Sequence, residues 1–405
     1  MSRSVVVKGI GVVSALGASA TAFRDGLLEG RTGIRPLERF DVRSCRTQAA
    51  APIVDIDAAR WITPMKLRRL DVTARYAFIA ARQACDDAGY VTSDGPNDQA
   101  GIIFGTFSAG GEATSEYLDA LHRGGPSGAP ALLFSSTVGN AAASFTGLEL
   151  GFRGPNVTVS QKEASGLTAV TQAVDLLRDS RAATMIAGGV DAIFEVFFTV
   201  HDRFAVMAPG DGEAAPSRPF DAHRSGFVLG EGGFALFLER ELAVSTPTYG
   251  RILGVGTAGA SVPINQWPPR PEPLVRTMRM ALEDAALGPD AVNAVYASAN
   301  ATTTLDRVEA EALTSLFRSH RPVITSIKGA IGECGASGAA SCAAALLCGG
   351  VGKVAPIAGL RNIDKACADL DIAREVRPLP GPIVLVNSFA SGGSLASVVL
   401  HVQGR

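Results

Sequence analysis

The stretch with the clearest chemical potential is a predicted bend between a short strand and a helix. Residues 157–160 are mostly β-branched, which is typical of a buried strand. From Ser165 onward the apolar residues recur at helical spacing, at Leu167, Val170, Val174 and Leu177. Such a bend lifts one side chain to the sheet edge, beside the free N–H groups of the helix. An enzyme can hold a nucleophile there, and a Cys would be acidified by the helix dipole. The residue at this bend is Glu163.

Four stretches resemble motifs of the β-ketoacyl synthases, which are condensing enzymes with the thiolase fold. At the bend the family has Cys, then Thr or Ser, then Ser-Gly-Leu, and this chain has Glu163 followed by residues 164–167, Ala-Ser-Gly-Leu. Residues 218–233 contain the family's Arg-Pro-Phe-Asp and Gly-Glu-Gly, and residues 326–336 and 387–393 match two further motifs. The resemblance covers essentially the whole chain. It implies an α/β thiolase fold with a duplicated five-layer αβαβα architecture.

The resemblance also implies three catalytic positions, and this chain has the family's residue at none of them. The family uses a Cys thiolate to hold the acyl chain and two His to assist decarboxylation and stabilise the enolate. These positions fall on Glu163, Ser298 and Glu333, whereas the family's Lys is retained as Lys328 and its gating Phe is replaced by Ser391. No histidine of the chain falls at a catalytic position; the five are His122, His201, His223, His320 and His401.

A family member without its nucleophile resembles the chain-length factor, the β subunit of type II polyketide ketosynthases. The resemblance implies a non-catalytic subunit in a heterodimer with a catalytic ketosynthase α subunit. Their substrate would be a polyketide bound to the phosphopantetheine of an acyl carrier protein, as in antibiotic biosynthesis, elongated by decarboxylative Claisen condensation. It implies neither a cofactor nor a metal. Chain-length factors for aromatic products typically carry Gln at position 163, so Glu163 is a departure from the aromatic subclass. A linear polyene product is favoured because the helix after Gly110-Gly111 has no aromatic residue on either candidate face for length control.

Two alternatives remain open for the same residues. The first is a decarboxylase that makes a starter unit from a malonyl-carrier, since exchange of the Cys removes acyl transfer and leaves decarboxylation. Ser298 and Glu333 are poor substitutes for the two His that this reaction uses. The second is an unrelated hydrolase with Glu163 and Glu333 as a carboxylate pair. Paired carboxylates alone are an unspecific signal.

Composition and charge exclude several other classes. The net charge of −2 gives no reason to expect nucleic-acid binding. The six cysteines have neither metal-binding spacing nor the pattern of a secreted disulfide scaffold, which favours reduced thiols and a cytoplasmic location. No apolar run is long and helix-like enough to cross a bilayer. The first residues lead into a strand and lack the features of a signal peptide.

Strands alternate with helices along both halves of the chain, which favours a layered α/β fold. We place the division between an N-terminal half, residues 1–245, and a C-terminal half, residues 246–405, at the sequence Thr246-Pro247-Thr248. A small-residue helix is expected after Glu163 in the first half and after Gly335 in the second. The two helices occupy corresponding places, which indicates an internal duplication.

Two further expectations concern assembly. Residues 135–144 are small, and with residues 157–160 they are expected to form the interface with the catalytic partner. The helix after Gly110-Gly111 matches the region where the resembled family closes the far end of its substrate tunnel. Two faces of this helix supply candidates for length control: Glu112, Ser115 and Asp119, or Ala113, Glu116 and Ala120. Phe134 is the best single gate candidate.

The last expectation concerns charge. In the geometry that the resemblance implies, Glu163, Glu333 and Lys328 converge in one pocket. Two buried carboxylates repel each other, so Lys328 is expected to bridge at least one of them. The plainest interpretation of Glu163 is that it caps the helix and neutralises Lys328.

Overall fold

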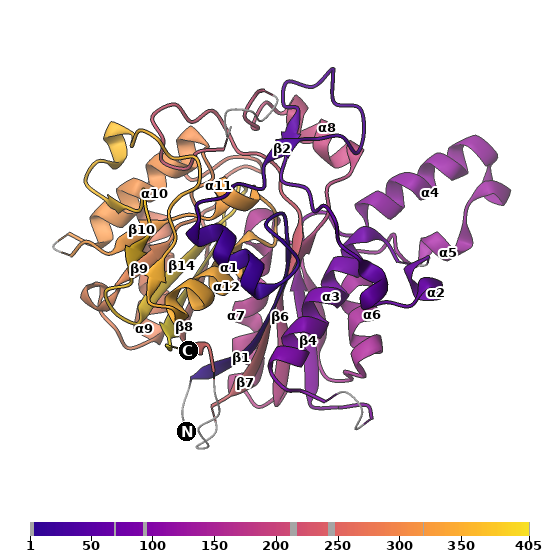
Figure 1. The fold of residues 1–405 in the computed structure, drawn as a ribbon, viewed down its shortest axis with the longest axis horizontal. Helices are drawn as coiled ribbons and strands as arrows, with labels where there is room; N and C mark the ends of the chain where they lie inside the picture. The colour runs from indigo at the N-terminus through magenta and orange to yellow at the C-terminus, as the bar shows by residue number, and fades with distance from the viewer. Residues whose placement is uncertain are drawn as a thin grey trace.

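Two sheets with the same strand order form the frame of the protein (Figure 1). The computed structural model describes residues 4–68, 70–91, 95–210, 217–241, 248–318 and 320–404. The N-terminal sheet runs β5-β4-β6-β7-β1 and consists of β1 (Val5–Ser14), β4 (Ala100–Gly105), β5 (Asn156–Val159), β6 (Thr184–Asp191) and β7 (Gly232–Arg240). The C-terminal sheet runs β10-β9-β14-β15-β8 and consists of β8 (Gly250–Gly259), β9 (Ala294–Tyr296), β10 (Val323–Thr325), β14 (Ile383–Phe389) and β15 (Ser394–Val402), with β12 (Asp371–Ile372) added beside β10.

The two halves repeat the same topology. In each, the first strand of the half pairs antiparallel with the last, and the second, third and fourth strands are parallel to one another. Residues 5–7 of β1 also pair with residues 250–252 of β8, which joins the described strands into one sheet of eleven. The predicted duplication is therefore confirmed. The predicted division at residue 245 lies outside the described residues.

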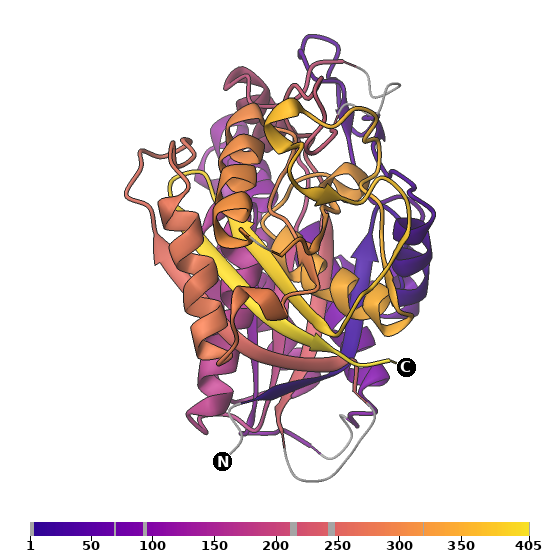
Figure 2. The ribbon, with the colours of Figure 1, turned by 90° about the vertical axis from the view of Figure 1, so that its left-hand side faces the viewer.

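Helices form three layers around the two sheets. The middle layer consists of α7 (Ser165–Arg178) and α12 (Ser337–Gly350), which pack on each other and on both sheets. On the outer side of the N-terminal sheet lie α3 (Val72–Asp87) and α6 (Ala141–Leu150). On the outer side of the C-terminal sheet lie α9 (Glu272–Asp284) and α10 (Thr303–Leu316), the orange helices beside the yellow strands in Figure 2. The five-layer αβαβα architecture is confirmed.

Shorter elements complete the chain. The remaining helices are α1 (Ala20–Leu28), α2 (Pro64–Leu67), α4 (Gly111–Gly124), α5 (Ala131–Phe134), α8 (Glu195–Arg203) and α11 (Lys328–Ile331). Two two-stranded ribbons pair β2 (Arg35–Pro36) with β3 (Ala49–Ala50), and β11 (Lys353–Val354) with β13 (Arg377–Pro378). Within the described ranges, no helix is long and apolar enough to cross a membrane.

Small residues explain how the middle layer fits between the sheets. Gly166 at the start of α7 donates its N–H to the carbonyl of Gly335 at 2.7 Å. A Cβ on Gly166 would lie 2.9 Å from that same oxygen, so a larger residue would push the two helices apart. The turn that carries Glu163, just before α7, therefore packs against α12.

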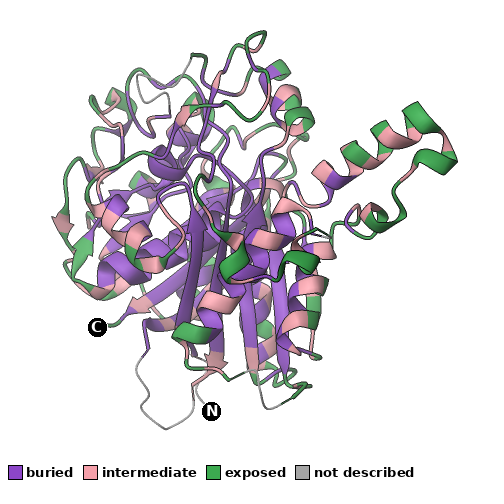
Figure 3. Cartoon of the chain, turned by 45° about the vertical axis from the view of Figure 1, so that its right-hand side comes forward, coloured by how far each residue is buried: buried purple, intermediate pink, exposed green. Residues whose placement is uncertain are grey.

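An arm made of α4 and α5 projects from the body of the protein (Figures 1 and 3). It begins at Gly110, whose φ of 76° is a conformation that glycine adopts at low cost. Several large apolar side chains on and next to this arm are exposed, namely Leu118, Leu132, Phe134 and Val138. The arm therefore contributes little to the core of its own chain.

Candidate functional site

The predicted bend is present. β5 ends at Val159, a 3₁₀ turn covers Lys162–Ala164, and α7 begins at Ser165. The Ser165 hydroxyl accepts from the N–H of Gln161 at 2.8 Å and lies 2.7 Å from the Lys162 carbonyl, which it can contact as a donor. These local hydrogen bonds tie the turn to the first residue of the helix and set the direction of Glu163.

Glu163 points into the interior and binds one residue of a distant segment. Its side chain is 3% exposed. Ser391, which follows β14, donates its N–H to Glu163 Oε2 at 3.1 Å and its hydroxyl to Oε1 at 3.0 Å. Burial raises the pKa of the Glu163 carboxyl, and the charge of Glu333 raises it further. The side chain at the bend is thus a buried, hydrogen-bonded carboxylic group.

Ser298 is fully buried just after β9, and its polar groups are used to hold neighbouring backbone. Its hydroxyl accepts from the N–H of Phe389 at 2.9 Å. Its own N–H donates to Glu309 Oε1 at 2.9 Å, and its carbonyl accepts from Lys328 Nζ at 2.8 Å. A hydroxyl engaged in this way connects β9 to the end of β14.

Glu333 forms a buried ion pair with Lys328. Lys328 Nζ donates to Glu333 Oε2 at 2.7 Å, and both side chains are at most 3% exposed. Asn300 Nδ2 donates to the same oxygen at 2.8 Å, whereas Oε1 has no hydrogen-bond partner among the described residues. The prediction that Lys328 bridges at least one of the two carboxylates is confirmed. The interpretation that Glu163 neutralises Lys328 is wrong, because the ion pair of Lys328 is with Glu333 and the side-chain partner of Glu163 is Ser391.

Glu309 on α10 is a further buried carboxyl close to this cluster. Its Oε1 accepts from the N–H of Ser298 and from Asn387 Nδ2 at 3.0 Å, while its Oε2 has no hydrogen-bond partner in the described part of the chain. Burial raises the pKa of Glu309 from 4.5 to about 7, against the lowering effect of these two hydrogen bonds. Burial likewise raises the pKa of Asp306, one turn earlier on α10, to about 6.

Because the pKa of Glu309 is raised, the effect of Glu309→Gln on the free energy of unfolding should depend on pH. In the folded protein Glu309 holds its proton up to about pH 7, whereas in the unfolded chain it loses it near 4.5. Its contribution to stability is therefore present below 4.5 and is lost as the pH rises towards 7. Glu309→Gln removes this dependence, so the stability of the variant relative to wild type should rise between about pH 5 and about pH 8.

Urea unfolding at the two pH values measures this difference. The control is Glu311→Gln, which replaces an exposed carboxyl on the same helix. Its effect on the free energy of unfolding should be nearly the same at both pH values. An equal effect of Glu309→Gln at both pH values would contradict the assignment of a raised pKa.

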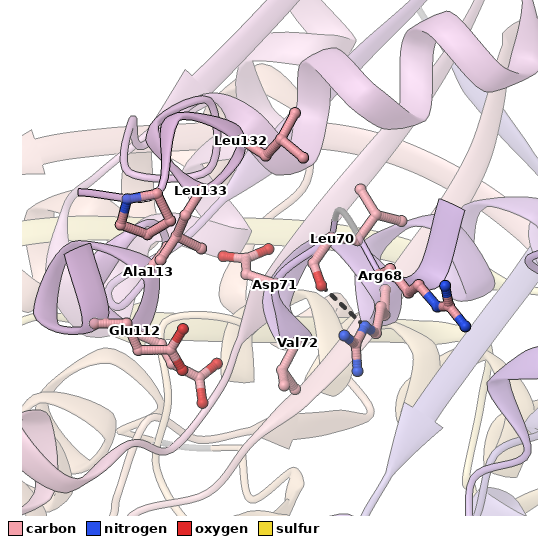
Figure 4. A pocket seen from close by; sticks show the side chains of 11 residues that line it. Arg68, Leu70, Asp71, Val72, Glu112, Ala113, Leu132 and Leu133 are labelled. Atoms are coloured by element: carbon pink, nitrogen blue, oxygen red, sulfur yellow. Dashed lines mark hydrogen bonds between the residues drawn. The ribbon is translucent and has the colours of Figure 1, made fainter. Parts of the chain in front are cut away.

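A cavity of about 320 Å³ lies between the arm and the start of α3 (Figure 4). Its wall mixes acidic, basic and apolar side chains: Arg68, Leu70, Asp71, Val72, Arg75, Glu112, Ala113, Glu116, Pro130, Leu132 and Leu133. Burial raises the pKa of Asp71 and of Glu112, and in Glu112 the acidic neighbours Glu116 and Asp71 add to the shift. The cavity is therefore a recess lined by both charged and apolar side chains.

The length-control candidates separate into two groups in the structure. Glu112, Ala113 and Glu116 line the cavity, whereas Ser115 and Phe134 do not. Phe134 is 58% exposed and packs against Tyr117, with 5.7 Å between the ring centroids. Phe134 therefore does not close the cavity within this chain.

Sequence reasoning missed three side chains of the site. Lys162 donates to Ser391 Oγ and to Asn265 Oδ1, both at 2.5 Å. Asn300 holds Glu333, as described above. Lys162 stands next to Glu163 in the chain, so its charge was a visible signal. Asn265 and Asn300 lie in loops without any helical or strand pattern that would have singled them out.

Comparison with known proteins covers the whole chain. Residues 2–243 match the β-ketoacyl synthase N-terminal domain, and residues 249–361 match the β-ketoacyl synthase C-terminal domain. The chain is 30% identical to the 3-oxoacyl-(acyl-carrier-protein) synthase 2 of Coxiella burnetii, over 98% of both chains. It is 33% identical to a protein of Streptomyces rimosus assigned as oxytetracycline polyketide β-ketoacyl synthase 1, over 100% of this chain and 98% of that relative.

Solved structures agree with these matches. The ishigamide ketosynthase/chain length factor superposes with a TM-score of 0.91 at 28% identity, and the superposition covers 100% of both chains. A β-ketoacyl synthase from Burkholderia phymatum superposes with a TM-score of 0.90 at 28% identity, over 99% of this chain and 100% of that one.

Proposed function

The chain belongs to the β-ketoacyl synthase family, and from that premise we propose that it is a chain-length factor, a non-catalytic subunit that pairs with a catalytic ketosynthase. The pair elongates a polyketide bound to an acyl carrier protein by decarboxylative Claisen condensation, and this chain helps to set the product length. The polyketide assignment of one relative and the ketosynthase/chain length factor among the similar structures support this proposal.

The observation that carries the proposal is the state of the three catalytic positions. Condensation needs a thiolate to hold the acyl chain and neutral imidazoles to donate to the thioester oxygen. Glu163 is engaged by Ser391, Ser298 by Phe389, and Glu333 by Lys328. Within the described contacts, none of these three residues has a histidine partner. A chain that retains the fold but has none of these three catalytic side chains can shape a path for the substrate. It cannot carry out the condensation.

Two surfaces support a protein partner. β5 lies at the end of the N-terminal sheet, so one edge of its backbone pairs with no strand among the described residues. The arm projects from the body of the protein (Figure 3), and on it Leu132 is 70% exposed and Phe134 is 58% exposed. Exposed apolar groups of this size on a projecting element are typical of an interface. We place the catalytic ketosynthase on these two surfaces.

The cavity beside the arm is the place where we expect the growing chain to end. It lies next to the proposed partner surface, and part of its lining is apolar, which suits an acyl chain. None of the described residues that line it is aromatic, so these residues provide no bulky plug. A linear polyene fits such a recess better than a polycyclic aromatic product does.

A matched pair of substitutions on α4 tests length control. Glu116→Trp places a bulky ring at the cavity wall, and Asp119→Trp makes the same charge change on the same helix away from the cavity. In the complex with its ketosynthase, Glu116→Trp should shift the products towards shorter chains, whereas Asp119→Trp should leave them unchanged. Mass spectrometry of the products measures the shift. Unchanged lengths from both variants would place the length control elsewhere, on the catalytic partner.

The starter-unit decarboxylase remains an alternative with weaker support. It requires a donor that stabilises a thioester enolate, and both Ser298 and Glu333 are engaged with protein groups. Release of carbon dioxide from malonyl-carrier by the isolated chain would favour this alternative. The hydrolase alternative has no support, because Glu333 is paired with a lysine and both carboxyls are buried.

A further inference from the structure

Two residues that depart from the family motifs, Glu163 and Ser391, bind each other. The N–H of Ser391 meets one carboxylate oxygen of Glu163 and its hydroxyl meets the other. Burial raises the pKa of this carboxyl, and the hydrogen bond from the Ser391 side chain acts against that rise. One backbone N–H and one hydroxyl, both from Ser391, therefore converge on a single carboxylate. Such a set of donors is a fitted cradle for an anion.

Lys162 completes the cradle on its outer side. Its φ of 51° is unusual for a residue with a side chain and carries a backbone cost, which the surrounding contacts must offset. Its ammonium donates to the Ser391 hydroxyl and to Asn265, and lies 5.5 Å from the centre of the Phe107 ring. The Ser391 hydroxyl thus accepts from the cation and donates to the carboxylate. A charge-assisted chain runs from Lys162 through Ser391 to Glu163.

The same contacts hold two loops in place. Asn265 belongs to the loop of residues 260–271, which follows β8. The N–H of Gly392 donates to the Gln266 carbonyl at 2.9 Å, and the N–H of Ala260 donates to the Gly393 carbonyl at 2.8 Å. The turn that carries Ser391 is therefore bound to the loop by backbone hydrogen bonds and to the bend by Glu163.

We propose that the bend of this protein is a carboxylate-binding site that the chain fills with its own Glu163 side chain. Glu163, Ser391, Lys162 and Asn265, which we call the Glu163 latch, fasten the bend to the turn after β14 and to loop 260–271. If the side chain of Glu163 is removed, the same donors bind a small free carboxylate such as acetate. One consequence rests on the proposed function. Because Glu163 occupies these donors, the thioester oxygen of a carrier-bound substrate cannot bind to them, and the substrate reacts in the catalytic partner.

Hydrogen exchange with mass spectrometry on the full chain tests the latch. In Glu163→Ala, amides of residues 390–393 and 260–271 should exchange at least about tenfold faster than in wild type, the factor expected for the loss of a charge-assisted hydrogen bond. Acetate should restore much of this protection in a saturable way, whereas chloride at the same concentration should not. Wild type should respond to neither anion, because its cradle is filled. Unchanged exchange in Glu163→Ala, or equal effects of acetate and chloride, would overturn the proposal.

A second variant changes the Lys162 side chain of the Glu163 latch, so that the proposal can be tested if Glu163→Ala does not fold. Lys162→Met keeps the length of the side chain and removes the charge. It should speed exchange in the same two segments, while Lys353→Met, an exposed lysine on β11, should not. Equal exchange in the two lysine variants would overturn the contribution of Lys162. These measurements need neither a partner nor a condensation assay, so failure of the length-control proposal would leave them unaffected.

Discussion

Replacement of Lys328 by methionine is expected to lower the free energy of unfolding by about 3–5 kcal/mol. The Lys328 ammonium is buried and donates to Glu333 Oε2 at 2.7 Å and to the Ser298 carbonyl at 2.8 Å. Methionine fills a similar space but carries no charge. It would leave the Glu333 carboxylate in the interior with Asn300 as its remaining side-chain donor. Urea unfolding followed by circular dichroism measures the loss.

Two further variants separate the ion pair from general damage to the core. Adding Glu333→Gln to Lys328→Met should recover most of the lost stability, because no uncompensated charge then remains in the interior. Lys353→Met, an exposed lysine, is the matched control and should change stability by less than about 0.5 kcal/mol. A Lys328→Met chain as stable as wild type would show that the ion pair does not stabilise the fold.

Thr158→Pro should prevent assembly with the catalytic ketosynthase without unfolding the chain. The carbonyls of Pro155 and Val159 accept from β4, so the backbone groups of alternate residues in β5 face β4 and those of Thr158 face outward. Proline removes one N–H and is tolerated where that N–H faces away from the sheet. If the partner's edge strand pairs with β5, the substitution deletes a hydrogen bond at the centre of the interface. Size-exclusion chromatography of the co-expressed chains should then show them eluting separately.

Neighbouring substitutions provide the controls. Thr158→Val keeps the N–H and removes a hydroxyl that has no hydrogen-bond partner, so the complex should persist. Val157→Pro removes an N–H that faces β4, and it should destabilise the chain itself. Co-elution of the Thr158→Pro chain with the ketosynthase would contradict pairing through β5.

Features that depend on residues close in sequence were predictable. The strand, turn and helix around Glu163 follow from a change of hydrophobic period and from the small residues after the turn. The pairing of Lys328 with Glu333 spans five positions and joins opposite charges on either side of one short helix. The duplication was predictable because α7 and α12 share a small-residue composition that only a crowded middle layer requires.

Features that depend on distant segments were not predictable. Ser391 lies 228 positions from Glu163, and nothing in its own neighbourhood indicates that both of its donors meet that carboxylate. Helical spacing left two faces of α4 equally plausible, and only the fold shows that Ala113 and Glu116 line the cavity while Ser115 does not. Phe134 was named as a gate because it is aromatic, but the projection of the arm leaves it exposed in this chain.

The position of β1 between β7 and β8 has a consequence for biosynthesis. β1 precedes the other strands of both sheets in the chain, yet its partners are residues 232–240 and 250–252. During synthesis its backbone stays unpaired until those residues have left the ribosome. Contacts so distant in sequence slow folding, because a long loop must close before any pairing is gained. The nascent chain therefore exposes an apolar strand for much of its synthesis, and its yield in the cell should depend on chaperones that bind such strands.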